Sequence, residues 1–277
     1  MKSSSGSTTS NIASTNSKQP KLRINKLGIV SHDYTGPGNT KKDFSDTFDR
    51  ILRILDKKGC DSVLFSLYTI DKRKNFNVKL HLESLTKITS VFVEEFINDQ
   101  DKNGPDEPEY IIYYKTPNCW GDYRFGQIFG KAEWLSKDTE KRVIEFKDKF
   151  ERKRIFGNFA VLLCGETNIV KYSKKDEEIY DKFNFLDTIP SEVTVILNPI
   201  HDRMTRFEMI KKRKFLSRNG RWVVSVWNKG KLYGENKKKR DGKKPAWTVF
   251  HNKEEVTIEN ISDQPDIEIG IVNIINM

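Results

Sequence analysis

The strongest constraint on the fold is a helical pattern flanked by two short apolar runs in the first quarter of the chain. Apolar side chains recur at helical spacing in 43–58, DFSDTFDRILRILDKK, and Gly59 follows as a stop signal. The run KLRINKLGIVS, 21–31, precedes this segment, and CDSVLFSLYTI, 60–70, follows it. Strand, amphipathic helix and strand in this order predict a β-α-β unit and a layered α/β domain.

The rest of the chain continues the alternation of strands and helices. Strands are predicted at 109–115, 122–129, 159–163, 192–197, 221–227, 246–250, 256–261 and 267–274. Helices are predicted at 80–99, 137–154 and 204–216, with a strand in ITSVFVEEF, 88–96, as the alternative for the first of them. Few helices among many strands favour a single α/β domain.

The first twenty residues, 1–20, differ from the rest in composition. They are rich in Ser, Thr and Asn and contain no apolar core of signal-peptide length, so we expect a disordered tail and no secretion signal. No stretch approaches the roughly 18 apolar residues of a membrane span. The three cysteines lack CxxC spacing, which favours a reducing, cytoplasmic setting over a disulfide framework.

A cysteine follows the apolar run 159–163, and a carboxylate follows the cysteine. In FGNFAVLLCGETN, 156–168, Cys164 ends the run and Glu166 stands two residues further on. Such a cysteine is commonly a small packed hydrophobe. The alternative is a nucleophile held at the rim of a pocket, for which a nearby base or cation would have to generate the thiolate.

Five segments of the second half occur in an order that resembles the nitrilase, or carbon–nitrogen hydrolase, superfamily. They are FAVLLCGE, VTVILNPIHD, RWVVSVWNKG, PAWTVFHNKEEV and IEIGIVNI. The resemblance implies an α-β-β-α sandwich, here expected over 21–277 as a nitrilase-like domain. It also implies a Glu-Lys-Cys triad that hydrolyses amides or nitriles, and homo-oligomers in which dimers form through the sandwich.

Carried over residue by residue, the resemblance gives two members of that triad. Cys164 becomes the nucleophile, and Lys131 in FGKAEWL becomes the lysine, with Lys115 in YYKTP as the alternative. A lysine beside the attacked carbon could stabilise the oxyanion of a tetrahedral intermediate.

The third member is absent from its expected place. The family's general base ends a strand in Pro-Glu, whereas VLFSLYTI has Ser66 and Leu67 there. Glu166 is the catalytic carboxylate that we predict instead, with His32 and Asp33 as further alternatives.

Polar residues at the ends of two later strands are predicted to bind the substrate. They are Asn198, His201 and Asp202 in NPIHD, and Asn228 in the segment WNKG. Asp202 has an alternative role as the N-cap of the following helix. The four histidines show neither HxxxH nor HExxH spacing, and no P-loop or GxGxxG follows a strand, so no metal and no cofactor are expected beside a small-molecule substrate.

Most of the positive charge lies in one region. Residues 202–244 contain 16 Lys and Arg against 4 Asp and Glu, a net of +12, so the rest of the chain sums to −2 of the total +10. This basic region, 211–244 in its densest part, is either a solvated surface or a binding site for nucleic acid or an acidic partner. The residues predicted for such binding are Lys237, Lys238, Lys239, Arg240, Lys243 and Lys244.

The sequence therefore supports two main hypotheses of different classes. The first is a cysteine hydrolase acting on a carbon–nitrogen bond, with an anionic substrate favoured by the nearby basic loop. The second is a catalytically degenerate module of the same fold that binds nucleic acid or an acidic partner through the basic region. A nuclease is a weaker third hypothesis, because no acidic-lysine cluster lies on one predicted strand.

Overall fold

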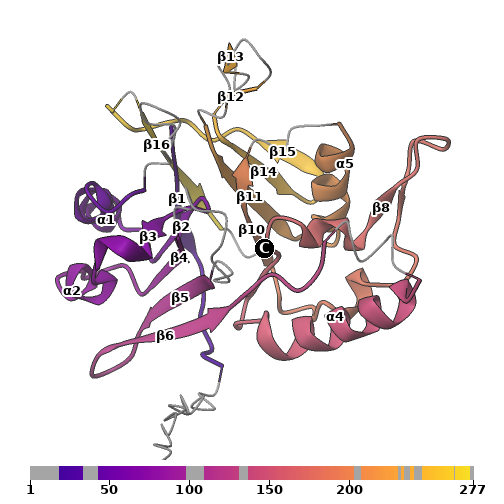
Figure 1. The fold of residues 1–277 in the computed structure, drawn as a ribbon, viewed down its shortest axis with the longest axis horizontal. Coiled ribbons are helices and arrows are strands. Elements are labelled where there is room, and N and C mark those ends of the chain that lie inside the picture. The colour runs from indigo at the N-terminus through magenta and orange to yellow at the C-terminus, as the bar shows by residue number, and fades with distance from the viewer. Residues whose placement is uncertain are drawn as a thin grey trace, which may run out of the picture.

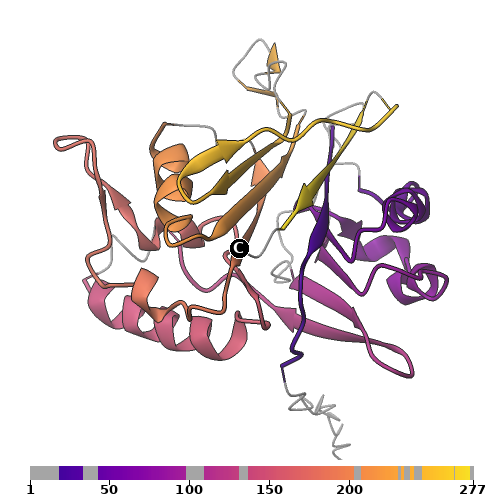
Figure 2. The same ribbon diagram turned by 180° about the vertical axis from the view of Figure 1, so that it is seen from behind.

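The structure is a computed structural model, and it describes residues 19–33, 43–97, 109–130, 137–202, 207–229, 232–233, 238–239, 245–264 and 266–274. Within these ranges the chain forms two facing β-sheets with helices on their outer sides (Figure 1; Figure 2 from behind). Of the predicted tail 1–20, residues 1–18 lie outside the described residues.

The first sheet is built mainly from the N-terminal half of the chain. Its strand order is β16-β1-β2-β4-β5-β6, and β3 pairs with β4. The strands are β1 Lys26–His32, β2 Ser62–Phe65, β3 Ile70–Asp71, β4 Ser90–Phe96, β5 Glu109–Lys115, β6 Trp120–Phe125 and β16 Ile267–Asn273. Strands β1, β2 and β4 are parallel, because helices α1 (Phe48–Lys57) and α2 (Val78–Leu82) cross over between them.

The second sheet is built from the C-terminal half, in the order β15-β14-β11-β10-β7. Its strands are β7 Phe159–Val161, β10 Val195–Asp202, β11 Trp222–Asn228, β14 Trp247–His251 and β15 Glu254–Val256. Strands β7, β10 and β11 are parallel, and helices α4 (Thr139–Lys153) and α5 (Phe207–Leu216) cover the outer face. Short strands complete the second half: β8 Lys171–Tyr172, β9 Ile179–Tyr180, β12 Leu232–Tyr233 and β13 Lys238–Lys239.

Alternating side chains along the strands build three apolar layers. One core fills the space between the sheets, a second joins the first sheet to α1 and α2, and a third joins the second sheet to α4. On β1, for example, Leu27 and Ile29 face the other sheet, while Gly28 faces α1, where an added Cβ would lie 2.7 Å from Leu55 Cδ1. The predicted α-β-β-α sandwich is therefore the observed architecture.

Two predicted elements differ from the structure. The helix expected at 80–99 is replaced by α2, which ends at Leu82, and by strand β4, which was the alternative reading. The strand expected at 256–261 lies earlier, because β15 forms a hairpin with β14 across the turn at Asn252 and Lys253, both of which have positive φ. Residues 257–261 have no regular structure.

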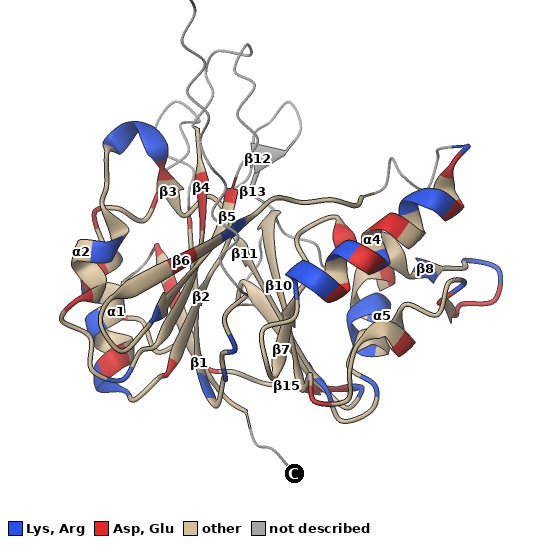
Figure 3. Cartoon of the chain, turned by 90° about the horizontal axis from the view of Figure 1, so that it is seen from below, with Lys and Arg blue, Asp and Glu red and all other residues tan. Residues whose placement is uncertain are grey.

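The two sheets are joined by hydrogen bonds where their parallel strands end. Ser31 Oγ donates to the main-chain oxygen of Trp227 at 2.6 Å, and the main-chain N–H of Lys229 donates to the oxygen of His32 at 3.0 Å. These contacts hold the carboxyl ends of β1 and β11 together. In Figure 3 the strands are mostly tan, whereas the charged residues gather on the helices and turns of the two outer sides. None of the helices in the described ranges has the length and apolarity that crossing a bilayer requires.

Candidate active site

Cys164 lies just beyond the carboxyl end of β7, in the turn that leads into the short 3-10 helix Glu166–Ile169. Its side chain is half-buried and packs against the apolar cluster of Ile200, Trp227 and Ala246. The carboxyl ends of parallel strands β7, β10 and β11 meet at this edge, which is where α/β sheets commonly hold their ligands.

His201 and Glu94 reach this edge from opposite sheets. His201 belongs to β10, and its Nε2 lies 2.9 Å from Oε1 and 3.2 Å from Oε2 of Glu94, which belongs to β4. Cys164 lies near enough to His201 to be one of the two side chains that raise the pKa of the imidazole. The three side chains therefore gather at this edge, with Glu94 at 5% exposure as the buried member.

The two neighbours of His201 determine its charge. Although burial lowers it, the side chains of Cys164 and Glu94 raise the pKa of His201 to about 10. The imidazole is therefore protonated at neutral pH, and its Nε2–H donates to the Glu94 carboxylate. A cationic imidazole beside a thiol favours the thiolate, which is the reactive form of cysteine.

Tyr68 holds both members of the His201–Glu94 pair. Its ring lies against the imidazole of His201, with 4.3 Å between the ring centroids. Its main-chain N–H donates to Glu94 Oε2 at 2.6 Å. Tyr68 adopts a φ of 61°, an uncommon value for a residue other than glycine, which directs that N–H at the carboxylate.

The predicted catalytic carboxylate, Glu166, lies behind the cysteine turn and is fully buried. Its Oε1 is 2.9 Å from Nη2 of Arg154, which is 1% exposed. It also accepts hydrogen bonds from the main-chain N–H groups of Ile128 at 2.9 Å and Leu163 at 2.8 Å. With its oxygens engaged in this way, Glu166 holds the residue before Cys164 in place.

Two of the four predicted substrate-binding residues are buried and bonded to neighbouring strands. Asn198 donates to the main-chain oxygen of Leu162 at 2.7 Å and accepts from Ser225 Oγ at 2.9 Å. Asn228 accepts from Ser66 Oγ and donates to the oxygen of Leu67. Ser66 and Leu67, where the family motif has Pro-Glu, therefore link the first sheet to β11.

The remaining predicted residues of this site are placed as follows. Lys131 lies outside the described residues, and Asp202 is described through its main chain alone, which pairs with Asn228. Lys115 lies at the opposite end of the first sheet, where its Nζ donates to the oxygen of Leu85 at 2.9 Å. His32 turns to the outer side of that sheet and packs on Phe44, with ring centroids 3.9 Å apart.

No group of three His, Cys, Asp or Glu side chains that could hold a metal ion occurs in the ranges that the structure describes. Asp33 forms an isolated parallel β-bridge with Lys229, beside the hydrogen bonds that join the two sheets. The expectation that the protein uses no metal and no cofactor stays a prediction.

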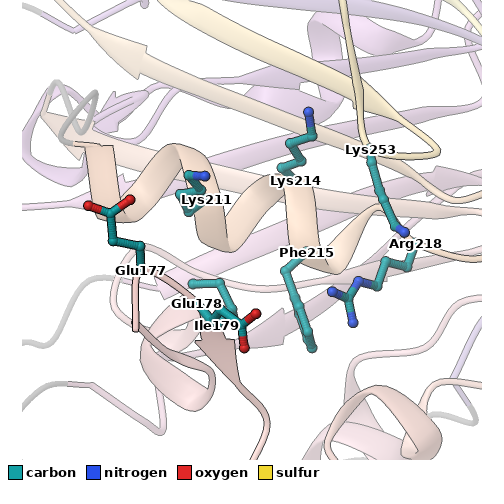
Figure 4. A pocket seen from close by; sticks show the side chains of 8 residues that line it. All are labelled: Glu177, Glu178, Ile179, Lys211, Lys214, Phe215, Arg218 and Lys253. Atoms are coloured by element: carbon teal, nitrogen blue, oxygen red, sulfur yellow. The ribbon is translucent and has the colours of Figure 1, made fainter. Parts of the chain in front are cut away.

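The basic region is described in part. Of the residues predicted to bind nucleic acid, Lys237, Arg240, Lys243 and Lys244 lie outside the described residues, and Lys238 and Lys239 are described as the backbone of β13. The start of the region lies on α5 and borders a hollow of about 260 Å³. Figure 4 shows the cationic side chains around this hollow: Lys211, Lys214, Arg218 and Lys253. Glu177 and Glu178 line its other side.

Of the side chains that meet at this edge, Cys164 and His201 were predicted, His201 as a substrate-binding residue, whereas Glu94 and Tyr68 were not. The signal for Glu94 was present in SVFVEEF, because a strand reading places Glu94 on the same face as Phe92, which packs between the sheets. The helix reading of 80–99 hid this alternation.

The sequence matches no protein-family model and no curated protein. The structure is similar to a glutamine-dependent NAD(+) synthetase from Cytophaga hutchinsonii, at TM-score 0.49 and 7% identity, covering 91% of this chain and 43% of that chain. It is similar to a carbon–nitrogen hydrolase from Helicobacter pylori G27, at TM-score 0.43 and 12% identity, covering 91% of this chain and 89% of that one.

A third similar structure is Nit3 of Saccharomyces cerevisiae, a member of branch 10 of the nitrilase superfamily. It matches at TM-score 0.46 and 10% identity and covers 91% of this chain and 93% of that chain. The sandwich described above rests on its own sheets and helices, and identities of this size say nothing about chemistry.

Proposed function

We propose that this protein hydrolyses the carbon–nitrogen bond of an amide, with Cys164 as nucleophile, His201 as the group that transfers protons and Glu94 as the carboxylate that orients His201. The observation that carries the proposal is the grouping of these side chains: His201 is hydrogen-bonded to Glu94, and Cys164 lies near enough to raise the pKa of His201. A nucleophile, a base within hydrogen-bond reach and a third group orienting the base are the usual parts of such a site.

The first half of the reaction forms a thioester. The Cys164 thiolate attacks the amide carbon, a sulfur–carbon bond forms, and the carbonyl oxygen becomes an oxyanion. The protonated His201 then gives its proton to the amide nitrogen as the carbon–nitrogen bond breaks, and the amine leaves. Glu94 stabilises the imidazolium before this transfer and keeps the ring in place afterwards.

The second half of the reaction consumes water. The neutral His201 takes a proton from a water molecule whose oxygen attacks the thioester carbon. The sulfur–carbon bond breaks, the carboxylic acid leaves, and the thiolate and the imidazolium are restored. In this assignment Glu94, from the strand next to β2, supplies the carboxylate that Ser66 and Leu67 lack.

The test uses two probes, iodoacetamide for the thiol and 4-nitroacetanilide as an activated neutral amide. At neutral pH we expect Cys164 to be alkylated about tenfold faster or more than the exposed Cys119, an internal control in the same chain. The variant H201N should remove that advantage, and H201N and C164A should lower anilide hydrolysis about 10²- to 10⁴-fold.

The variant E94Q separates orientation from packing, because glutamine keeps the size of the side chain and loses its charge. We expect an intermediate loss of both the alkylation rate and hydrolysis, with folding checked by circular dichroism. If Cys164 and Cys119 are alkylated equally fast and H201N changes neither rate, Cys164 is a packed hydrophobe and the proposal is wrong.

The hollow on α5 supports a second candidate function, the binding of a polyanion such as nucleic acid. Four cations line it opposite Glu177 and Glu178, and Lys214 is 3.8 Å from Glu254, a long and exposed ion pair that an anion could replace. A single-stranded oligonucleotide should bind with an affinity that falls steeply with salt. The double variant K211A/K214A should weaken this binding, whereas K141A/K149A on α4 should not.

A further inference from the structure

Arg213 is a fully buried cation that lies between α5 and the second sheet. Its side chain has 0% exposure, although the residue stands in a run of four basic residues on a helix. Its guanidinium lies 5.5 Å from the centre of the Trp227 ring, and Nη1 donates to Thr248 Oγ1 at 3.0 Å. One of its three nitrogens is therefore bonded, by a neutral hydroxyl.

The other two nitrogens of Arg213 lack acceptors. Nε and Nη2 are buried, and neither has a hydrogen-bond partner among the described residues. These two nitrogens form one edge of the guanidinium, and their N–H groups are parallel. An edge of this kind can donate one hydrogen bond to each oxygen of a carboxylate. Burial lowers the pKa of Arg213 to about 10, so the group is still charged at neutral pH.

The other buried arginines of the described chain use more of their nitrogens, although Nη1 of Arg221 also lacks a partner. Arg154 is as deeply buried and is compensated by the Glu166 carboxylate. Arg221 is 6% exposed, and the same Nε–Nη2 edge donates to two main-chain oxygens, at 3.1 and 2.9 Å. A buried charge without a counter-charge lowers the stability of a folded protein. An anion bound at the unoccupied edge of Arg213 would remove that loss.

Arg213 and Cys164 share a neighbour. Cys164 packs against the cluster of Ile200, Trp227 and Ala246, and the guanidinium of Arg213 lies over the Trp227 ring of that cluster. Burial is the larger effect and lowers the pKa of Arg213, whereas Cys164 is a nearby group that raises it. Cys164 and Arg213 thus lie against the same apolar cluster.

We propose that the Nε–Nη2 edge of Arg213 binds a carboxylate group of the substrate, so that the Cys164 site selects anionic substrates over neutral ones. This inference rests on the proposed function and adds the substrate class and the residue that recognises it. The guanidinium supplies both charge and direction, because its two parallel N–H groups fix the plane of the bound carboxylate.

Two alkylating agents of nearly equal size test the inference. Iodoacetate and iodoacetamide both form a sulfur–carbon bond with release of iodide, and they differ in carrying a carboxylate or a neutral amide. The measured quantity is the ratio of their rates at Cys164, compared with the ratio for the same cysteine in the urea-unfolded chain. We expect the ratio in the folded wild type to be about ten- to a hundredfold higher.

The variants assign that preference to one side chain. R213Q should lose most of the preference for iodoacetate, and R213K, which keeps the charge without the paired N–H groups, should lose part of it. R221Q removes a second buried arginine from the far end of β11 and should leave the ratio unchanged.

Each outcome decides between the two proposals. A Cys164 that reacts readily with iodoacetamide but shows the same ratio in the wild type, R213Q and R213K overturns the inference and leaves the proposed function standing. A Cys164 that is inert to both reagents in the folded protein overturns the proposed function. If R213Q does not fold, a wild-type ratio equal to that of the unfolded chain also overturns the inference.

Discussion

The buried pair of Arg154 and Glu166 leads to a quantitative prediction about stability. In the variant E166Q, the Arg154 guanidinium at 1% exposure loses the carboxylate that lies 2.9 Å away. Glutamine keeps one oxygen that can accept from Leu163 or Ile128, but its amide group then faces N–H donors. The charge of Arg154 is left uncompensated in the interior.

The magnitude follows from how buried ion pairs respond to the loss of one partner. Burial raises the pKa of Glu166 and lowers that of Arg154, so desolvation of the charges outweighs their attraction. The intact pair therefore adds little net stability, whereas removal of one member costs about 3–5 kcal/mol. Against a total of about 5–15 kcal/mol for a typical domain, E166Q should be severely destabilised.

Urea unfolding followed by tryptophan fluorescence measures this effect. The double variant R154M/E166Q removes both charges and should recover about 1–3 kcal/mol of the loss. The control D148N breaks the exposed pair of Asp148 and Arg152, which are 49% and 74% exposed, and should change stability by less than about 0.5 kcal/mol. An E166Q variant as stable as the wild type would refute this account of the pair.

Three further predictions concern single residues. The folded pKa of His201, about 10, exceeds its unfolded value of about 6.5, so its contribution to stability is complete below pH 6.5 and disappears as the pH rises through 10. The difference in unfolding free energy between the wild type and H201N should shrink over that range. Burial raises the pKa of Cys60 to about 11, so mass spectrometry should find it unalkylated in the folded protein at pH 8. Gly157 has a φ of 83°, and an added Cβ would lie 2.2 Å from the oxygen of Leu22. In the same urea assay, G157A should lower the free energy of unfolding by more than the about 1–3 kcal/mol expected from backbone strain. The control G59A, at a φ of 75° with open space around it, should lose only the amount due to strain.

Strands whose pattern is local were predictable from the sequence. EYIIYYK gave β5 with its observed limits, and the run 159–163 placed β7 and the cysteine that follows it. A helix was predicted where the structure has β4. Glu94 and Glu95 favour a helix when considered alone, but in the structure their strand lies between β2 and β5 in the sheet. Tertiary context decided between the helix and the strand that the local pattern left open.

The site was predictable to the same degree. Cys164 and His201 follow apolar runs, and the ends of parallel strands meet in space, so both could be named. The contact of Glu94 with His201 and the burial of Arg213 could not be predicted, because Glu94 reaches His201 from the other sheet and Arg213 is buried from a helix that looks solvated. Both contacts cross from one layer of the sandwich to the next, and spacing along the chain carries no information about them.

The division of the site between two sheets makes its geometry depend on residues that never touch a substrate. Glu94 stands on one sheet and His201 on the other, and the side chains packed between the sheets determine their separation. Such sheets lie about 10 Å apart, and closely packed interiors transmit changes in volume. A methylene gained or lost at Val161 or Leu197 would therefore lengthen or shorten the hydrogen bond between Glu94 and the imidazole of His201. The proposed reactivity of Cys164 can thus be adjusted from the hydrophobic core.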